Sequence, residues 1–175
     1  MSLQILDKLA NCQSKVQITE LALEIVAYPQ LLPYYFKLCD QHELEDANKA
    51  AWVIRTYFQK IKKIKLIDQK KVLTLLDTTY NEAVLRNLSG ILADLPFDEK
   101  IEDETVHVCF KILSDLNHEV AVYSNVLLIL IPIIKKYPAL KDEIKILAER
   151  NPMKDKCAFQ LRVKTVLSLT TENLK

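Results

Sequence analysis

The chain carries the stretch LDTTYNEAVLR at residues 76–86, and it repeats the pattern of this stretch as LSDLNHEVAVY at residues 113–123. In both stretches an aspartate and a polar turn separate two apolar segments. At the equivalent position of each repeat the chain carries a small or β-branched residue, namely Ala50, Ala83, Val120 and Cys157. These anchors lie 33, 37 and 37 positions apart. A period of this size predicts stacked helix pairs, because one pair cannot bury its apolar face alone. The alternative is an irregular helical bundle with accidental periodicity.

The composition predicts helices throughout the chain. Half of the 175 residues are hydrophobic and 27% are charged, which is typical of a globular protein. The sequence contains one glycine and six prolines, so turns that need a positive φ are almost absent. This scarcity disfavours β-hairpin folds and α/β folds with glycine-rich phosphate loops. We therefore expect a single all-α domain over residues 1–175.

Apolar residues recur at helical spacing and predict about ten helices. The expected helices cover residues 3–10, 16–27, 31–40, 45–61, 68–76, 81–94, 102–114, 119–136, 140–149 and 155–169. Asp68 and Asn81 are the expected N-caps of the fifth and sixth helices. The seventh helix has an expected buried stripe of four residues, Val106, Cys109, Phe110 and Leu113.

Several short segments carry a resemblance to a known family: KAAWVI at 49–54, VHVCFKIL at 106–113, VAVYS at 120–124, KYPALKDEI at 136–144, AER at 148–150 and AFQLR at 158–162. Over residues 28–169 the chain resembles a family of short bacterial HEAT-like proteins, few of which have an assigned function. Some members carry an adenylosuccinate lyase name. The resemblance implies an all-α, HEAT/armadillo-like α–α superhelix of about ten helices in stacked antiparallel pairs. As a function it implies little more than binding.

The sequence lacks the motifs of several enzyme classes. An adenylosuccinate lyase needs a mobile serine loop of the S-S-x-M-P-x-K-x-N type and a much longer chain, and no such string occurs here. GxSxG motifs, CxxC pairs and glycine-rich phosphate loops are also missing from the sequence. The three histidines, His42, His107 and His118, do not have metal-ligand spacing, and His118 is a candidate helix cap. We therefore expect no enzyme, no cofactor and no metal site.

The second helix of each pair usually lines the binding side of a helix-pair repeat protein. On these helices the candidate binding residues are Trp52, Arg55, Arg86, Asn87, Tyr123, Asn125 and Arg162. Tryptophan and arginine are enriched at binding hot spots, because they combine apolar area with directional hydrogen bonds. However, Trp52 lies within an apolar segment, which favours a core position. Arg86 is also interpreted as an ion-pair partner of Asp77 or Asp115 across repeats.

Lysines gather in one segment of the chain, at Lys60, Lys62, Lys63, Lys65, Lys70 and Lys71. The alternative function is therefore a nucleic-acid-binding helical-repeat protein of the DNA-repair type, for which HEAT-like DNA glycosylases are a precedent. Only isoleucine and leucine are interleaved with the lysines over residues 60–67, no aromatic platform accompanies them, and the net charge of the chain is +1. These features favour a solvated helix end and loop, so we do not expect a nucleic acid as the partner.

We expect a cytoplasmic, non-enzymatic interaction or scaffold module that binds a protein or peptide on its helical-repeat surface. Residues 1–10 lack an apolar signal core. The longest apolar run, residues 126–134, is far shorter than the ~20 residues that a membrane span needs, so it predicts a buried central helix. The four cysteines, Cys12, Cys39, Cys109 and Cys157, are widely spread, and we expect them to be reduced and structural.

Overall fold

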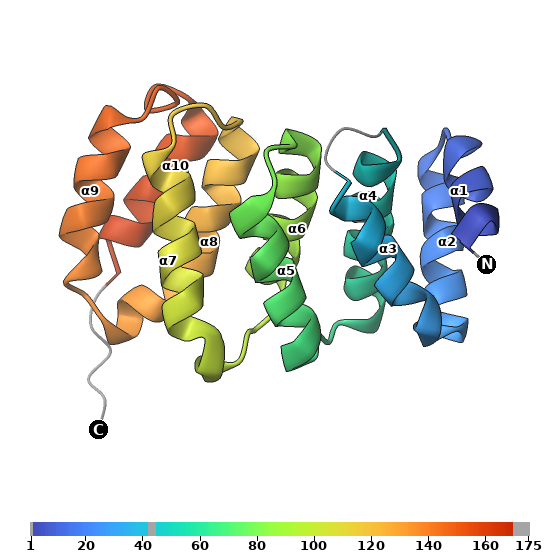
Figure 1. Ribbon diagram of the computed structural model, residues 1–175. Coiled ribbons are helices and arrows are strands. Elements are labelled where there is room, and N and C mark those ends of the chain that lie inside the picture. The colour runs from blue at the N-terminus through green and yellow to red at the C-terminus, as the bar shows by residue number, and fades with distance from the viewer. Residues whose placement is uncertain (1, 42–44, 170–175) are drawn as a thin grey trace. The chain divides into compact units, whose positions relative to one another are not determined.

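The computed structural model describes residues 2–41 and 45–169, and the chain divides into two compact units. Unit 1 comprises residues 1–96, and unit 2 comprises residues 97–175. Within the described residues the structure contains ten α-helices and no β-strand (Figure 1). The prediction of an all-α chain with about ten helices is therefore confirmed. The single domain over residues 1–175 stays a prediction.

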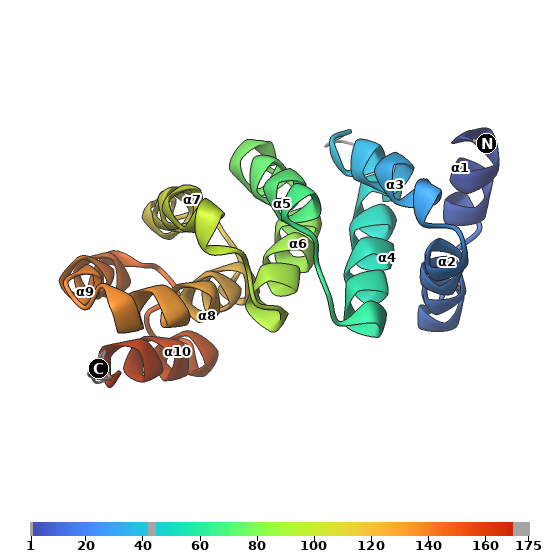
Figure 2. The ribbon, with the colours of Figure 1, turned by 90° about the horizontal axis from the view of Figure 1, so that it is seen from below.

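Unit 1 contains three helix pairs arranged in two layers. Its helices are α1 (Ser2–Ala10), α2 (Lys15–Ala27), α3 (Leu32–Cys39), α4 (Glu45–Ile61), α5 (Leu66–Thr78) and α6 (Glu82–Asp94). A short 3₁₀ turn, Pro29–Leu31, leads into α3. Figure 2 shows α2, α4 and α6 in one layer and α1, α3 and α5 in the other. Helix α4 contacts α2, α3 and α6, so it forms the centre of the unit.

Small residues allow the neighbours of α4 to approach it closely. The buried residues of α4 are Ala47, Ala50, Ala51, Val53, Ile54, Tyr57 and Phe58. The three alanines are at most 1% exposed. An alanine adds only a methyl group to the helix surface, so the packed helices α2 and α3 can lie near the α4 backbone. The larger Tyr57 and Phe58 rings fill the C-terminal end of α4, where their centroids are 5.0 Å apart in an edge-to-face arrangement.

Side-chain caps determine where two helices of unit 1 begin. Before α2, the Ser14 hydroxyl accepts the backbone N–H of Gln17, and the Gln17 side chain accepts the N–H of Ser14 in return. Before α6, the Asn81 side chain accepts the N–H groups of Ala83 and Val84 at 3.0 and 3.2 Å. The prediction of Asn81 as an N-cap is therefore confirmed.

The prediction of Asp68 as an N-cap is wrong. Helix α5 begins at Leu66, its N-cap is Lys65, and Asp68 lies in the first turn of the helix. The Asp68 carboxylate accepts a hydrogen bond from the Lys65 backbone. It therefore still satisfies one of the unpaired N–H groups at the start of the helix, but as the residue three positions after the cap.

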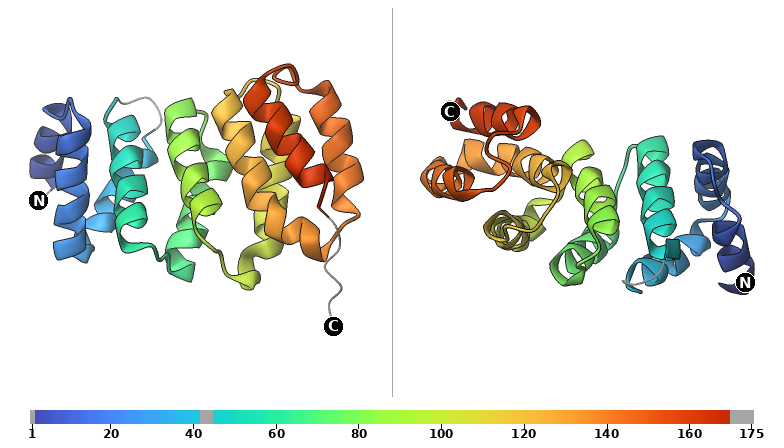
Figure 3. Two further views of the ribbon diagram at one scale, coloured as in Figure 1. Left: turned by 180° about the vertical axis from the view of Figure 1, so that it is seen from behind. Right: turned by 90° about the horizontal axis from the view of Figure 1, so that it is seen from above.

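Unit 2 contains four helices and one 3₁₀ turn. They are the turn Glu99–Ile101 and the helices α7 (Glu102–Ser114), α8 (Val120–Lys136), α9 (Leu140–Arg150) and α10 (Cys157–Leu167). Helix α8 contacts both α7 and α10, and Figure 3 shows α10 (red) lying against α8 and α9. Six of the residues between Val126 and Ile134 are buried, so the prediction of a buried central helix is confirmed.

The buried face of α7 differs from the expected stripe. Cys109 and Leu113 are buried as predicted, but Val106 and Phe110 are only half-buried. The core also receives Thr105, Val108 and Ile112. Thr105 can take a core position because its hydroxyl donates to the Ile101 carbonyl at 2.7 Å, which removes the penalty of burying a free hydroxyl.

Candidate functional site

Helix α4, which lies in the same layer as α2 and α6 (Figure 2), presents Trp52 to solvent. Successive residues of an α-helix are separated by about 100° around its axis, which places Trp52 opposite the buried face of α4. The Trp52 side chain is 38% exposed, so the prediction that favoured a core position is wrong. Thr56 and Gln59 continue the outward-facing stripe along the helix, and Gln59 is exposed. The apolar neighbours of Trp52 in the sequence are buried because they lie on other faces of the same helix.

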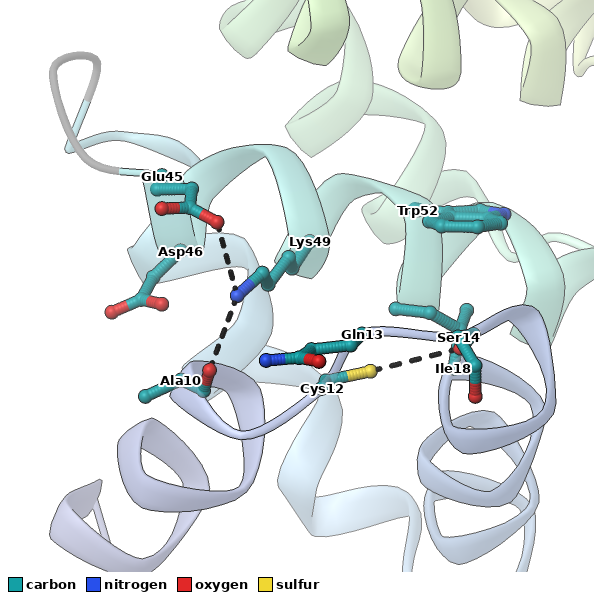
Figure 4. Close-up of a pocket in the computed structure, with 9 residues that line it drawn as sticks. All are labelled: Ala10, Cys12, Gln13, Ser14, Ile18, Glu45, Asp46, Lys49 and Trp52. Atoms are coloured by element: carbon teal, nitrogen blue, oxygen red, sulfur yellow. Dashed lines mark hydrogen bonds and ion pairs between the residues drawn. The ribbon is translucent and has the colours of Figure 1, made fainter.

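A hollow of about 710 Å³ lies beside Trp52, between α4 and the turn that joins α1 to α2. Its lining residues are Ala10, Cys12, Gln13, Ser14, Ile18, Glu45, Asp46, Lys49 and Trp52. Figure 4 shows the indole above Ser14 and Ile18, with Glu45, Asp46 and Lys49 at the opposite end. The hollow therefore combines an apolar wall with a charged end, which suits a peptide that has both kinds of side chain.

Lys49 holds the α1–α2 turn in place beside α4. Its ammonium group donates to the carbonyl of Ala10 at 3.3 Å and lies 3.2 Å from a carboxylate oxygen of Glu45. Ala10 is the last residue of α1, where carbonyl groups have no partner within the helix and a cation is favourable. The Lys49 side chain is only 18% exposed, so it forms part of the wall of the hollow.

Arg55 has a structural position between α4 and α6. Its guanidinium lies 3.4 Å from a carboxylate oxygen of Asp94, and Gln59 donates to the same oxygen at 3.3 Å. A Cβ atom built on Gly90 would lie 2.4 Å from Cζ of Arg55, so the arginine lies directly over the α6 backbone at the only glycine of the chain. The backbone at Gly90 does not have positive φ. The glycine is therefore explained by the close approach of Arg55 and not by a turn.

The two candidate residues on α6 differ in their exposure. Arg86 is half-buried, whereas Asn87 is 8% exposed and its amide donates to the Ala83 carbonyl of its own helix at 2.8 Å. The prediction that Asn87 lies on a binding surface is therefore wrong, because its side chain is buried and bonded within the helix. The pairing of Arg86 with Asp77 or Asp115 stays a prediction.

In unit 2, Tyr123 is a core residue with no exposed area, and its predicted place on a binding surface is also wrong. Its hydroxyl donates to the Asp115 carbonyl at 2.5 Å and accepts the backbone N–H of His118 at 3.1 Å. Its ring makes edge-to-face contacts with His118 and Phe159. Tyr123 therefore ties the α7–α8 turn to α8, and it packs against α10.

The remaining candidate residues and the two described histidines belong to unit 2. Asn125 in α8 and Arg162 in α10 are half-buried, and their role in binding stays a prediction. His107 is exposed, whereas His118 is 9% exposed and lies before Glu119, the N-cap of α8. His118 is therefore not the cap, although its ring lies 3.6 Å from an Asp115 carboxylate oxygen. His42 lies outside the described residues.

The buried thiols lack the environment of a nucleophile. Cys12, Cys39 and Cys109 are buried, and only Cys157 is exposed. Burial raises the pKa of the Cys39 thiol to about 12, and it raises the pKa of Cys109 further. Within the part of the chain that the structure describes, no group of three or more possible metal ligands was found. The same residues include no helix that is both long enough and apolar enough to cross a membrane.

Paired helices stacked in layers define this chain as an α-helical repeat protein. The family model of the HEAT repeat domain matches residues 5–168, so the chain belongs to the HEAT repeat family. No match to the chain was found among curated proteins or among solved structures.

Proposed function

We propose that the chain is a non-enzymatic protein-interaction module, and that the α4 face around Trp52 binds a peptide segment of a partner protein. The observation that carries the proposal is the exposure of the only tryptophan of the chain beside a hollow with an apolar wall and a charged end. Membership of the HEAT repeat family supports an interaction role. The four free thiols, three of them buried, suit a reducing compartment such as the cytoplasm.

The indole can supply a useful part of the binding energy. Covering the exposed 38% of the side chain would remove roughly 90 Å² from water, which is worth about 2 kcal/mol. A loss of this size weakens binding by a factor of about 30. Arg86 is half-buried on α6, the neighbour of α4 in the same layer, and it is the second residue that we assign to this surface. Arg55 is assigned a structural role instead, because it packs over Gly90 and pairs with Asp94.

The experiment is a selection of peptides from a displayed random library on the 175-residue chain, followed by titration of the enriched peptides. Because Trp52 is the only tryptophan, its fluorescence reports directly on the proposed site. We expect saturable fluorescence changes in the unmodified protein. Because W52A lacks this fluorophore, its affinity and that of the unmodified protein are compared by anisotropy of fluorescein-labelled peptides, and we expect W52A to weaken binding by at least about tenfold.

The matched control is Y80A, which also removes an exposed aromatic side chain of unit 1, in this case one that is 87% exposed. Selected peptides that bind W52A as tightly as the unmodified protein would refute the assignment of the site.

A further inference from the structure

A second surface of unit 1 combines a dense positive charge with an apolar pocket. The segment from Lys60 to Lys71, called the lysine segment below, contains six lysines and one aspartate, Asp68. The whole chain contains 24 Lys and Arg and 23 Asp and Glu, so the rest of the chain has 18 basic and 22 acidic residues. The positive charge is therefore concentrated in one segment of an otherwise acidic chain.

The six lysines of this segment are exposed. Within residues 2–41 and 45–169, no carboxylate oxygen lies within 4.0 Å of any of their ammonium groups, so none of them forms an ion pair there. By contrast, Lys136 is bound to Glu99 and Glu102, and Lys8 is bound to Glu24. Among the described residues the lysine segment thus retains its charge for an external anion.

A pocket of about 490 Å³ lies where α4 turns into α5. Its apolar lining consists of Tyr57, Phe58, Ile61, Ile64 and Pro96, and its polar lining consists of Lys62, Lys63, Lys65 and Asp68. The turn is sharp because Lys62 has φ of 50° and donates its N–H to the Phe58 carbonyl at 2.8 Å, which ends α4. The backbone reversal therefore brings three lysines to the edge of an apolar pocket.

We propose that this pocket binds an acidic peptide segment of a partner protein, with one apolar side chain in the pocket and carboxylates beside Lys62, Lys63 and Lys65. Charge complementarity favours an anionic partner, and the apolar lining requires that the partner also carry an apolar group. The site lies at the end of α4, about 13 Å along the helix axis from Trp52. It is therefore separate from the Trp52 hollow.

A peptide fits these features better than a nucleic acid. Single-stranded nucleic acids bind through bases that stack on exposed aromatic rings, but Tyr57 and Phe58 are only 8% and 1% exposed. A duplex needs several phosphate contacts along an extended basic surface, whereas the remainder of the chain carries an excess of carboxylates. A short acidic peptide can remain within the lysine segment.

Substitution of Asp68 tests whether the ligand of this pocket is negatively charged. It is the only carboxylate in the pocket lining, and burial raises its pKa. A carboxylate at this position repels an acidic ligand. Asn in place of Asp68 keeps an oxygen that can accept the hydrogen bond from the Lys65 backbone. The D68N variant should therefore bind an acidic peptide more tightly than the unmodified protein does.

The probe is a fluorescein-labelled peptide of about ten residues, with a central phenylalanine flanked by glutamates. Fluorescence anisotropy with the full chain should show saturable binding that weakens as NaCl rises from about 50 to about 200 mM. We expect K62E/K63E/K65E to weaken binding by at least about tenfold and D68N to tighten it by about twofold. Replacing the phenylalanine of the peptide by serine should weaken binding by about fivefold.

The matched control is K145E/K154E/K164E, which changes the net charge equally at three exposed lysines of unit 2 and should leave binding within about twofold. W52A should also leave it unchanged, so this proposal and the Trp52 proposal fail independently. Circular dichroism checks that each variant folds, and K63E/K65E replaces the triple variant if Lys62 proves essential for the turn.

Three results would overturn the proposal. One is the absence of saturable binding, and another is equal binding of the phenylalanine and serine peptides, which would indicate simple ion exchange. The third is tighter binding of a labelled DNA duplex that is lost in K62E/K63E/K65E, which would make the lysine segment a nucleic-acid interface.

Discussion

Substitution of Gly90 by alanine tests the contact between α4 and α6 most directly. Gly90 is buried in the middle of α6, where an alanine would ordinarily stabilise a helix by about 1 kcal/mol. However, the added Cβ would lie 2.4 Å from Cζ and 2.7 Å from both terminal nitrogens of Arg55. The guanidinium must therefore move, and its contact with Asp94 is strained or lost.

The expected magnitude follows from these two opposing effects. The atoms in the way are the far end of a flexible side chain, so the guanidinium can move aside and the main loss is its contact with Asp94, worth about 0.5–1 kcal/mol. G90A should therefore change the free energy of unfolding by between about 0 and +0.5 kcal/mol. In the R55A background the obstacle is absent, and the same substitution should stabilise the protein by about 1 kcal/mol. The coupling energy between Gly90 and Arg55 is therefore about 0.5–1 kcal/mol.

The assay is urea unfolding of the unmodified protein, G90A, R55A and the double variant, followed by far-UV circular dichroism. The m-values must agree among the four proteins, because unequal slopes would indicate a change in the unfolding mechanism. If G90A has the same effect in both backgrounds within about 0.3 kcal/mol, then Arg55 does not lie over Gly90 in solution, and our explanation of the glycine is refuted.

Three further predictions concern single side chains. Y123F removes a hydroxyl that donates to the Asp115 carbonyl and accepts the His118 N–H, so it should destabilise the protein by about 1–3 kcal/mol in urea unfolding. The control Y80F, at a tyrosine that is 87% exposed, should have little effect. K62G should raise the free energy of unfolding by about 0.5–1 kcal/mol, because Lys62 is the only non-glycine residue with positive φ in the described part of the chain; a decrease would show that the turn is not left-handed there. A chromogenic thiol reagent should modify Cys157 rapidly in the native protein and the three buried cysteines only after unfolding; rapid reaction of more than one thiol without denaturant would contradict the described burial.

Helix existence and most helix bounds could be predicted from local patterns. Helix α4 at Glu45–Ile61 and helix α7 at Glu102–Ser114 begin and end as the apolar spacing predicts. The start of α5 was misplaced because Asp68 satisfies a backbone N–H from within the first turn, and sequence spacing does not distinguish this arrangement from an N-cap. In α7, Thr105 occupies a core position that its hydrogen bond to Ile101 makes favourable, which a hydrophobicity pattern does not reveal.

The candidate site was predicted less well than the fold. Trp52 and Arg86 were singled out from the sequence, and the structure leaves both with exposed or half-exposed side chains. Tyr123 was also singled out, but it is a buried residue whose hydroxyl bonds the preceding turn. The same residue types serve binding surfaces and cores, because tyrosine and tryptophan have both a large apolar area and a polar group. Their position relative to neighbouring helices decides between the two roles.

The sequence by itself determined the class of the protein, its helices and its concentration of lysines between residues 60 and 71. These properties depend on local spacing and composition, which the order of residues contains directly. Only the tertiary structure decided that Trp52 is exposed, that Arg55 packs over Gly90, and that the lysine segment borders an apolar pocket. The exposure of Trp52 depends on which faces of α4 the neighbouring helices cover, and the contact between Arg55 and Gly90 depends on the packing of α4 against α6. The pocket is formed by the turn from α4 to α5 together with Pro96 from beyond α6.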